Sequence, residues 1–244
     1  MAVGIGSEVA WYCPSLDTAG DGTGTLTDLV NGNDGTITNA TWETDTGSGG
    51  TRALDFSSGY VTIPNSGDLA FGFDPWWFSI WFKLDSTASL QMILDKGFNT
   101  GGITRFYFLL LNSTTFRIFT GDVATSLEFG VPSGYLNTWV NVIFQRDGAV
   151  VGAWVDGTIA DTYGSLSLGR TFTNADILSL GDRSDQTNAF PMSGRLDDTR
   201  FGTGVLSSED IANLSSQRAY QPGGACLWDG CSDGVWTSWS DNWA

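Results

Sequence analysis

The sequence predicts an all-β fold, a sandwich of two antiparallel sheets, from three observations. Residues 139–157, WVNVIFQRDGAVVGAWVDG, contain two runs in which apolar side chains recur at every second position, which is the period of a strand. An Asp-Gly pair follows each run, and such pairs accept the positive φ angles of tight turns. Glycine is abundant at 32 residues, and a chain of 244 residues can bury one sizeable core. Together these features indicate many short antiparallel strands.

Eleven segments satisfy the strand criteria, and this number suits a two-sheet sandwich. They are residues 53–56, 60–63, 76–84, 92–95, 105–111, 115–120, 127–131, 139–146, 150–155, 177–180 and 193–201. In the hairpin of residues 139–157, Val142 and Phe144 share one face of the first strand, and Val151 and Ala153 share one face of the second.

One segment, residues 208–214, is predicted to be helical. Ser207 can cap its start, and Asp210, three residues further on, can reach back in a capping-box arrangement. Residues 44–52 and 181–191 are expected to be exposed loops. The predicted fold therefore contains a single short helix near its C-terminal end.

The composition changes after this helix, which divides the chain into a domain of residues 1–218 and a tail of residues 219–244. The tail is rich in Gly, Cys and Trp, an apolar load that would be awkward in free solution. We expect the tail to dock, either on its own domain or on a neighbouring subunit or larger assembly. The residues that would mediate docking are Trp228, Trp236, Trp239 and Trp243.

The cysteines leave the redox compartment open. Cys226 and Cys231 could close a small loop, whereas Cys13 lies far from them in the sequence. Because the chain has no histidine and three cysteines, a zinc site is not expected.

The formal net charge of −16 argues against a nucleic-acid partner, because affinity for the phosphate backbone comes mainly from Lys and Arg. Such acidity more often gives solubility, although it also supplies carboxylates for hard cations. The N-terminus has neither a basic leader nor a sustained apolar segment, so no signal peptide is expected, and no segment approaches the length of a membrane span. We expect a virion or extracellular location.

Several segments resemble a known family in their order along the chain. They are TDLVNGNDGTI (27–37), LDFSSGYVTI (54–63), WWFSIWFK (76–83), ILDKG (93–97), WVNVIFQRDG and AWVDG within 139–157, ILSLGD (177–182), and GRLDDTRF and LSSEDI within 194–211. Taken together, residues 9–218 resemble the laminin-G-like domains of the concanavalin A-like lectin and glucanase superfamily. The resemblance implies a jelly roll of two antiparallel sheets, one convex and one concave. It does not imply one function, since this fold carries lectins, hydrolases, adhesion domains and structural modules.

The residues present argue against an enzyme. Glycosidases usually need two carboxylates across the scissile bond, and members of this fold that resemble laminarinases carry Glu, Asp and Glu on alternate residues of one strand. The glutamates here are far apart in sequence: Glu8, Glu43, Glu128 and Glu209. Asp197 and Asp198 are adjacent, so strand alternation predicts that they face opposite sides. The absence of histidine removes Ser-His-Asp and Cys-His catalysis.

A structural calcium site is the sharpest chemical hypothesis. Calcium prefers six or more oxygen ligands, and in related domains a cation often joins an N-terminal loop to the Asp of the last long strand. By that likeness the candidate ligands are Asp28, Asn31, Asp34 and Asp197. The alternative is that the loop forms an ordinary turn while Asp197 pairs with Arg195 or a backbone amide. Both readings stay open.

A binding surface for a glycan or partner could lie on the strand of residues 76–84. Trp77 and Trp81 share one face of this strand and could form a sugar-stacking platform on the concave sheet. The alternative is that both rings are covered by loops or by a neighbouring subunit. Residues 106–108, Phe-Tyr-Phe, carry the same ambiguity.

Three functional classes follow. The first is a non-catalytic recognition, adhesion or structural module, expected in a phage virion as a head decoration or fibre, since the two lysines and the aromatic tail fit assembly inside a lysing host. The second is a secreted carbohydrate-binding lectin. The third, least favoured, is a β-glucan hydrolase. The expected partners are a glycan, another virion or cell-surface protein, or a second copy of the chain.

Overall fold

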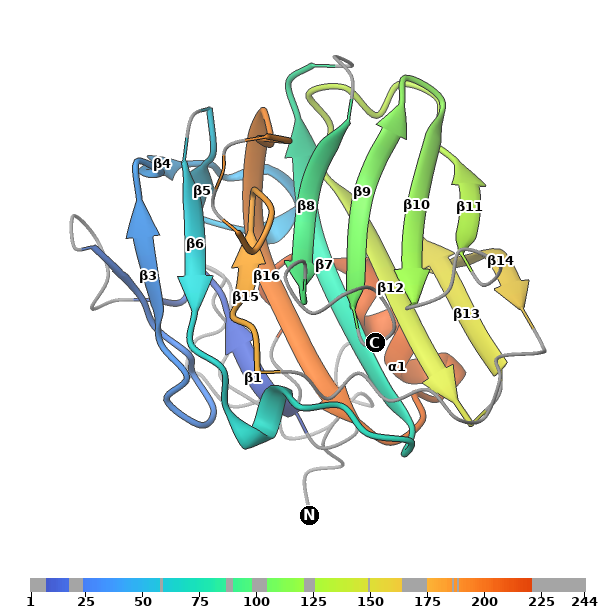
Figure 1. Ribbon diagram of the computed structural model, residues 1–244. Helices are drawn as coiled ribbons and strands as arrows, with labels where there is room; N and C mark the ends of the chain where they lie inside the picture. The colour runs from blue at the N-terminus through green and yellow to red at the C-terminus, as the bar shows by residue number, and fades with distance from the viewer. Residues whose placement is uncertain are drawn as a thin grey trace, which may run out of the picture.

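The computed structural model describes residues 8–17, 24–57, 59–86, 90–97, 105–120, 126–148, 150–163, 175–185, 187 and 189–220. Within these residues two antiparallel sheets, A and B, pack face to face (Figure 1). Sheet B lies nearer the viewer in Figure 1 and sheet A lies behind it. The two-sheet sandwich predicted from the sequence is therefore confirmed.

Sheet A has the strand order β14-β13-β12-β7-β16-β5-β4, with β1 paired to the second half of β16. Its strands are β1 (Glu8–Tyr12), β4 (Thr41–Thr44), β5 (Arg52–Asp55), β7 (Trp76–Leu84), β12 (Val140–Asp147), β13 (Val150–Val155), β14 (Thr158–Tyr163) and β16 (Gly194–Thr203). Sheet B has the order β11-β10-β9-β8-β15-β6-β3-β2. Its strands are β2 (Thr25–Leu26), β3 (Gly35–Thr38), β6 (Tyr60–Ile63), β8 (Gln91–Lys96), β9 (Phe106–Asn112), β10 (Thr115–Thr120), β11 (Leu127–Gly130) and β15 (Leu178–Leu180).

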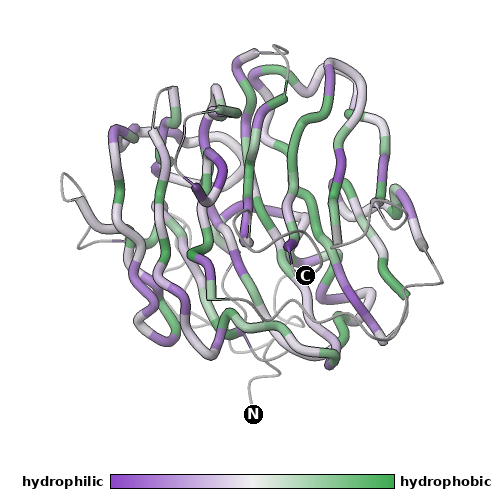
Figure 2. The backbone as a smooth tube through the Cα atoms, viewed as in Figure 1, coloured by the Kyte–Doolittle hydropathy of each residue, from purple (hydrophilic) through white to green (hydrophobic). Residues whose placement is uncertain are grey.

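The main core lies between the sheets and is built by strand alternation. Phe78 and Phe82 of β7 point inward and are fully buried, as are Phe108 of β9 and Phe144 of β12. The rings of Phe78 and Phe144 stack with centroids 5.4 Å apart. Figure 2 shows hydrophobic segments along the strands of both sheets. Burial of this aromatic surface is the main driving force for joining the two layers.

The hairpin geometry follows the prediction closely. Strand β12 pairs with β13, and Val142 and Phe144 join the core together with Val151 and Ala153. The next turn links β13 to β14 through Asp156 and Gly157, whose φ angles of 47° and 76° are those of a tight two-residue turn.

Five strands lie outside the predicted set, namely β1 to β4 and β14. Strands β2, β3 and β4 have two to four residues, and β14 reads Thr-Ile-Ala-Asp-Thr-Tyr with several exposed positions. Such strands cannot be recognised from their length or hydrophobic pattern. Their strand conformation depends on hydrogen bonds to the neighbouring strands of the sheet.

The single α-helix, α1 (Ser208–Ser216), has the predicted capping box. The Ser207 hydroxyl accepts a hydrogen bond from the Asp210 amide, and the Asp210 carboxylate accepts one from the Ser207 amide. Two short 3-10 turns, η1 (Gly47–Gly49) and η2 (Gly67–Leu69), complete the secondary structure of the described residues. Helix α1 packs on the outer face of sheet A, where Ile211 and Leu214 meet Trp77 and Ile143.

Candidate functional site

The outer face of β7 is closed. Trp77 and Trp81 are 0% and 4% exposed, because Trp77 packs against Ile211 and Leu214 of α1 and Trp81 packs against Ala53 and Trp139. The indole N–H of Trp81 donates to the carbonyl oxygen of Leu214 at 3.0 Å. The sequence prediction of a sugar-stacking platform at these two tryptophans is therefore wrong for this structure. Alternation placed both rings on the correct face, but the helix that follows β16 occupies it.

The N-terminal loop of residues 27–34, which contains three of the predicted calcium ligands, is organised around the Asp28 carboxylate. Its Oδ1 accepts hydrogen bonds from the amides of Trp11 and Val30, and its Oδ2 accepts from Asn31, from Asn33 and from the Asn33 side chain. A carboxylate offers about four lone-pair positions. These five donors therefore saturate Asp28.

The remaining loop candidates also have protein partners. The Asp34 Oδ1 accepts from the Asp28 amide at 2.9 Å, and the Asn31 side-chain amide donates to the Val9 carbonyl oxygen at 2.9 Å. These contacts correspond to the ordinary turn that the sequence left open as an alternative.

Asp197 lies in a separate environment on the outer side of β16. It accepts hydrogen bonds from the amide and hydroxyl of Ser15 and from the Asp198 amide, and its Oδ2 is 3.2 Å from Nε of Arg218. Arg195 instead pairs with other carboxylates. Among the described residues no group of three or more His, Cys, Asp or Glu side chains could hold a metal ion. The observed donors do not fit the predicted calcium site.

A β-bulge changes the direction of Asp198. Between Asp197 and Arg200 the register of β16 against β7 shifts, because three steps along β16 match two along β7, from Trp81 to Ser79. Asp198 has a φ of 31°. Both carboxylates consequently face the outer side of sheet A, and both act on the Cys13 thiol. The prediction that they face opposite sides is wrong, because simple alternation does not anticipate a bulge.

The two carboxylates belong to what we call the acid–arginine cluster, whose members are Glu8, Asp197, Asp198, Arg200 and Arg218. Arg200 makes a two-pronged contact with Asp198 at 2.6 and 2.9 Å and pairs with Glu8 at 3.0 Å. Asp198 also accepts from the indole N–H of Trp11 at 2.6 Å. Both arginines and both aspartates are at most 1% exposed.

Arg218 carries the chain that follows α1 into this cluster. Its guanidinium lies 3.8 Å from the ring centre of Trp139 and donates to the Asp45 carbonyl oxygen at 2.7 Å. Gly50 permits this approach, since a Cβ there would lie 2.1 Å from the guanidinium. The next residue, Ala219, donates its amide to Asp198 at 2.8 Å. The segment assigned to the tail by sequence therefore begins with residues that pack on the sandwich.

Burial dominates the electrostatics of the cluster. Burial raises the pKa of Asp197 to about 6, although Arg218 opposes the shift. Burial, followed by the charges of Asp197 and Asp198, also raises the pKa of the Cys13 thiol, so this cysteine is held in its unreactive protonated form. The cluster is a buried network of ion pairs that holds distant segments together, and its carboxylates are not accessible to a substrate as an acid–base pair would be.

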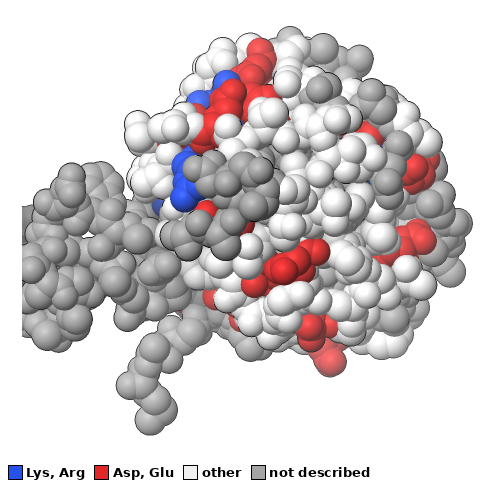
Figure 3. Space-filling view, turned by 90° about the vertical axis from the view of Figure 1, so that its left-hand side faces the viewer, with Lys and Arg blue, Asp and Glu red and all other residues white. Residues whose placement is uncertain are grey.

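The glutamates are similarly occupied. Glu8, Glu43 and Glu128 each pair with a different arginine, at 3.0, 2.6 and 2.5 Å, and Glu209 lies in the first turn of α1. Figure 3 shows the side of the molecule formed by β3 and β4, where the basic side chains in view lie beside carboxylates. No two of these glutamates share a site.

The outer face of sheet B carries a different arrangement, centred on Tyr107 of β9. Tyr107 is the direct cross-strand partner of Phe119 on β10, and the two rings stack with centroids 4.8 Å apart and an interplanar angle of 4°. The guanidinium of Arg105 lies 4.6 Å from the Tyr107 ring centre. The neighbouring residues Phe106 and Phe108 point into the core.

Charged groups flank these rings. Arg117 pairs with Glu128 at 2.5 Å, and the two side chains are 31% and 44% exposed. Arg105 donates to Asp95 at 2.8 Å. Although burial opposes it, hydrogen bonds to Glu128 and Tyr107 raise the pKa of Arg117. We call Arg105, Tyr107, Arg117, Phe119 and Glu128 the sheet-B aromatic patch. The alternation in residues 105–111 and 115–120 could have identified it, since it places Tyr107 and Phe119 opposite the core side.

The tail predictions cannot be compared with contacts, because Trp228, Trp236, Trp239, Trp243, Cys226 and Cys231 lie outside the described residues. Within the part of the chain that the structure does describe, no helix is long and apolar enough to cross a membrane.

Comparisons with known proteins agree with this fold. Domain 4 of AbnA, an extracellular arabinanase of family GH43 from Geobacillus stearothermophilus solved with arabinotriose, superimposes with a TM-score of 0.64 at 15% identity, covering 86% of this chain and 98% of that one. The botulinum neurotoxin serotype G binding domain gives 0.64 at 13% identity, covering 86% and 50%. The serotype D ligand-binding domain in complex with N-acetylneuraminic acid gives 0.62 at 15% identity, with the same coverage.

This chain thus spans about half the length of the two toxin domains. No curated protein matches it by sequence. The family model of the concanavalin A-like lectin/glucanases superfamily matches residues 55–212. The chain belongs to the concanavalin A-like lectin/glucanases superfamily.

Proposed function

We propose that this protein is a non-catalytic recognition module that binds a glycan through the sheet-B aromatic patch. The observation that carries the proposal is the stacked pair of Tyr107 and Phe119 beside the partly exposed pair of Arg117 and Glu128. Sugars bind proteins through contact of their apolar faces with aromatic rings and through hydrogen bonds from their hydroxyl groups to polar side chains. Tyr107 is partly exposed, whereas Phe119 is 8% exposed and supports the Tyr107 ring from below. The contacts that the patch offers a glycan are therefore the Tyr107 ring and the partly exposed side chains of Arg117 and Glu128.

The arrangement of carboxylates supports binding rather than hydrolysis. A glycosidase holds two carboxyl groups on either side of the scissile bond. The acidic pair that is adjacent in sequence, Asp197 and Asp198, is buried and engaged by Arg218 and Arg200. A buried pair that is neutralised in this way has no access to a glycosidic oxygen.

A glycan array tests the proposal, followed by titration calorimetry on each hit. Arabino-oligosaccharides and sialylated glycans are natural first probes, since arabinotriose and N-acetylneuraminic acid are the ligands in two structurally similar proteins. We expect Tyr107→Ala and Arg117→Ala each to weaken binding at least tenfold, the usual effect of removing a central contact. Phe73→Ala is the matched control, because Phe73 is 53% exposed and lies outside the patch. Equal affinity of all variants would contradict the proposed surface.

Such a module could act in two settings. One is a virion, as a head decoration or fibre, and the other is outside the cell, as a secreted lectin. The composition supports the first, and mass spectrometry of purified virions tests it. Absence of the protein from the particles would dismiss it.

We further propose that folding does not depend on calcium. The saturation of Asp28 by five donors and the pairing of Asp197 with Arg218 support this. We expect the same melting temperature in calcium and in EDTA, whereas a bound structural ion would raise it by mass action.

A further inference from the structure

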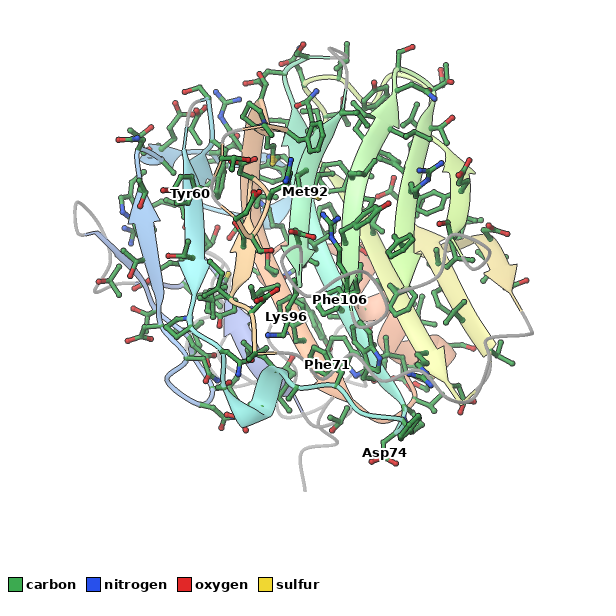
Figure 4. All side chains as sticks on the ribbon, viewed as in Figure 1. Tyr60, Phe71, Asp74, Met92, Lys96 and Phe106 are labelled. Carbon is green, nitrogen blue, oxygen red and sulfur yellow. The ribbon has the colours of Figure 1, made fainter. Side chains whose placement is uncertain are left out.

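Lys96 occupies an unusual position for a charged residue. It is fully buried, and in the ladder of sheet B it lies directly between Phe106 of β9 and Leu178 of β15. Paired residues on neighbouring strands point to the same face, and both neighbours belong to the core. Figure 4 shows Lys96 beside Phe106 and Phe71. A lysine on the core-facing side of a sheet is rare unless its amine has a defined partner.

The Lys96 amine has two partners, and both are neutral oxygens. Nζ donates to Oδ1 of Asn65 at 2.9 Å and to the carbonyl oxygen of Asp176 at 2.6 Å. Burial lowers the pKa of Lys96 to about 8, although the Asp176 charge opposes this. A substantial fraction of the amine is therefore neutral and nucleophilic at slightly alkaline pH.

The topology brings these three residues to one end of sheet B. Strand β15 lies between β8 and β6, with Leu178 paired to Lys96 on one side and to Ile63 on the other. Asn65 lies two residues beyond Ile63, and Asp176 lies two residues before Leu178. The Lys96 side chain thus reaches past the end of β15 to the side-chain amide of Asn65. Its Nζ contacts Oδ1 of Asn65, the atom bonded to Cγ.

We propose that Lys96 and Asn65 form an intramolecular isopeptide bond. The neutral Nζ attacks Cγ of Asn65, a new N–C bond forms, and the bond from Cγ to Nδ2 breaks. The proton lost by Nζ passes to the departing nitrogen, which leaves as ammonia. The Asp176 charge acts on Lys96 electrostatically, while its carbonyl oxygen holds Nζ in place beside Asn65. The reaction consumes no oxidant, cofactor or energy source.

Such a bond would tie β8 to the chain after β6 across the intervening strand. It would close the loop of residues 65–96 in the unfolded chain, and covalent closure of a loop stabilises the native state by restricting the unfolded one. The proposal does not depend on glycan binding.

Intact-mass spectrometry of the full chain, incubated at pH 8, tests the proposal. We expect the wild-type mass to fall below the sequence mass by one ammonia, and a peptide map to contain a branched peptide joining Asn65 to Lys96. Lys96→Arg and Asn65→Ala should each keep their full sequence masses. Lys83→Arg is the matched control and should still lose ammonia, because Lys83 lies on sheet A rather than sheet B and pairs there with Asp45.

Two results would overturn the proposal. The first is a wild-type protein at its full sequence mass after incubation. The second is a loss of ammonia that persists in Lys96→Arg, which would indicate succinimide formation at an asparagine such as Asn31, followed by Gly32. Hydroxylamine distinguishes a succinimide from an isopeptide bond, since it opens the succinimide and leaves the isopeptide bond intact.

Discussion

At the scale of single residues, the acid–arginine cluster shows what alternation can and cannot predict. The sequence identified Asp197 as a residue of special chemistry, and the structure gives it partners from two distant segments, Ser15 and Arg218, besides the amide of its neighbour Asp198. Arg218 carries no local signal of its role. Its position depends on Gly50 and Trp139, which only the folded chain brings together.

Arg218→Ala should therefore be one of the most damaging single substitutions. Removing one partner of a buried ion pair leaves an uncompensated charge, here on Asp197, and typically costs about 3–5 kcal/mol. The measurement is the free energy of unfolding in urea. Arg117→Ala is the control, because its partly exposed pair with Glu128 should contribute no more than about 1 kcal/mol. Similar losses in both variants would contradict a special role for the cluster.

Asp197 should also give stability a recognisable pH dependence. Its pKa is raised from 3.8 to about 6 by burial, so the folded state favours the protonated form. The stabilising contribution is complete below the unfolded pKa, near pH 4, and is lost as the pH rises through about 6. A shift of this size corresponds to about 3 kcal/mol.

The matched variant is Asp197→Asn, which cannot titrate. We expect the unfolding free energy of the variant to improve relative to wild type between pH 4 and pH 7. Urea unfolding of both proteins across this range measures the difference. A constant difference would show that the folded-state pKa of Asp197 is not raised.

At the scale of secondary-structure elements, α1 illustrates the gap between local and tertiary information. Ser207 and Asp210 predicted its start and its capping box, because these are local signals. Nothing in the segment itself identifies the surface on which it packs. The error at Trp77 and Trp81 follows directly, since the open or closed state of a sheet face depends on a distant element.

Leu214→Ala tests this packing. Leu214 is 1% exposed against Trp77 and Ile143, so its truncation should cost about 2–5 kcal/mol through lost burial and the cavity left behind. Water entering beside the indoles should also shift tryptophan fluorescence to longer wavelength. Val205→Ala, at a position 49% exposed, should change neither quantity appreciably. A stable Leu214→Ala protein with unchanged fluorescence would show that α1 does not seal the sheet.

At the scale of the whole molecule, most of the sandwich could be predicted because its central strands are long and alternate regularly. The aromatic alternation of β7 and β12 fixed which side chains form the core. The short strands β2, β3 and β4 gave no comparable signal, since each has too few residues to show a period and is held in place by hydrogen bonds to a neighbouring strand. The sheet-B aromatic patch was partly predictable, because the periodicity of residues 105–111 placed Tyr107 opposite Phe106 and Phe108.

The extent of the folded body gives a prediction about the whole chain. Sequence composition placed the boundary after residue 218, but Ala219 is 3% exposed, and the Tyr220 carbonyl oxygen accepts a hydrogen bond from Arg200. A chain ending at Tyr220 should therefore be more stable than one ending at Gln217 by about 3–5 kcal/mol, because the shorter chain leaves Asp197 buried without Arg218.

Thermal unfolding of the two truncated chains measures this difference. The chain ending at Tyr220 but carrying Arg218→Ala serves as the control, and we expect it to lose most of the same stability. If it stays as stable as its parent, the backbone contacts of Ala219 and Tyr220 rather than the Arg218 ion pair hold the segment, since Ala219 alone donates to Asp198. Equal melting temperatures for chains ending at Gln217 and Tyr220 would instead place the end of the cooperative unit at α1, with the charge of Asp197 compensated by Ser15 and the Asp198 amide.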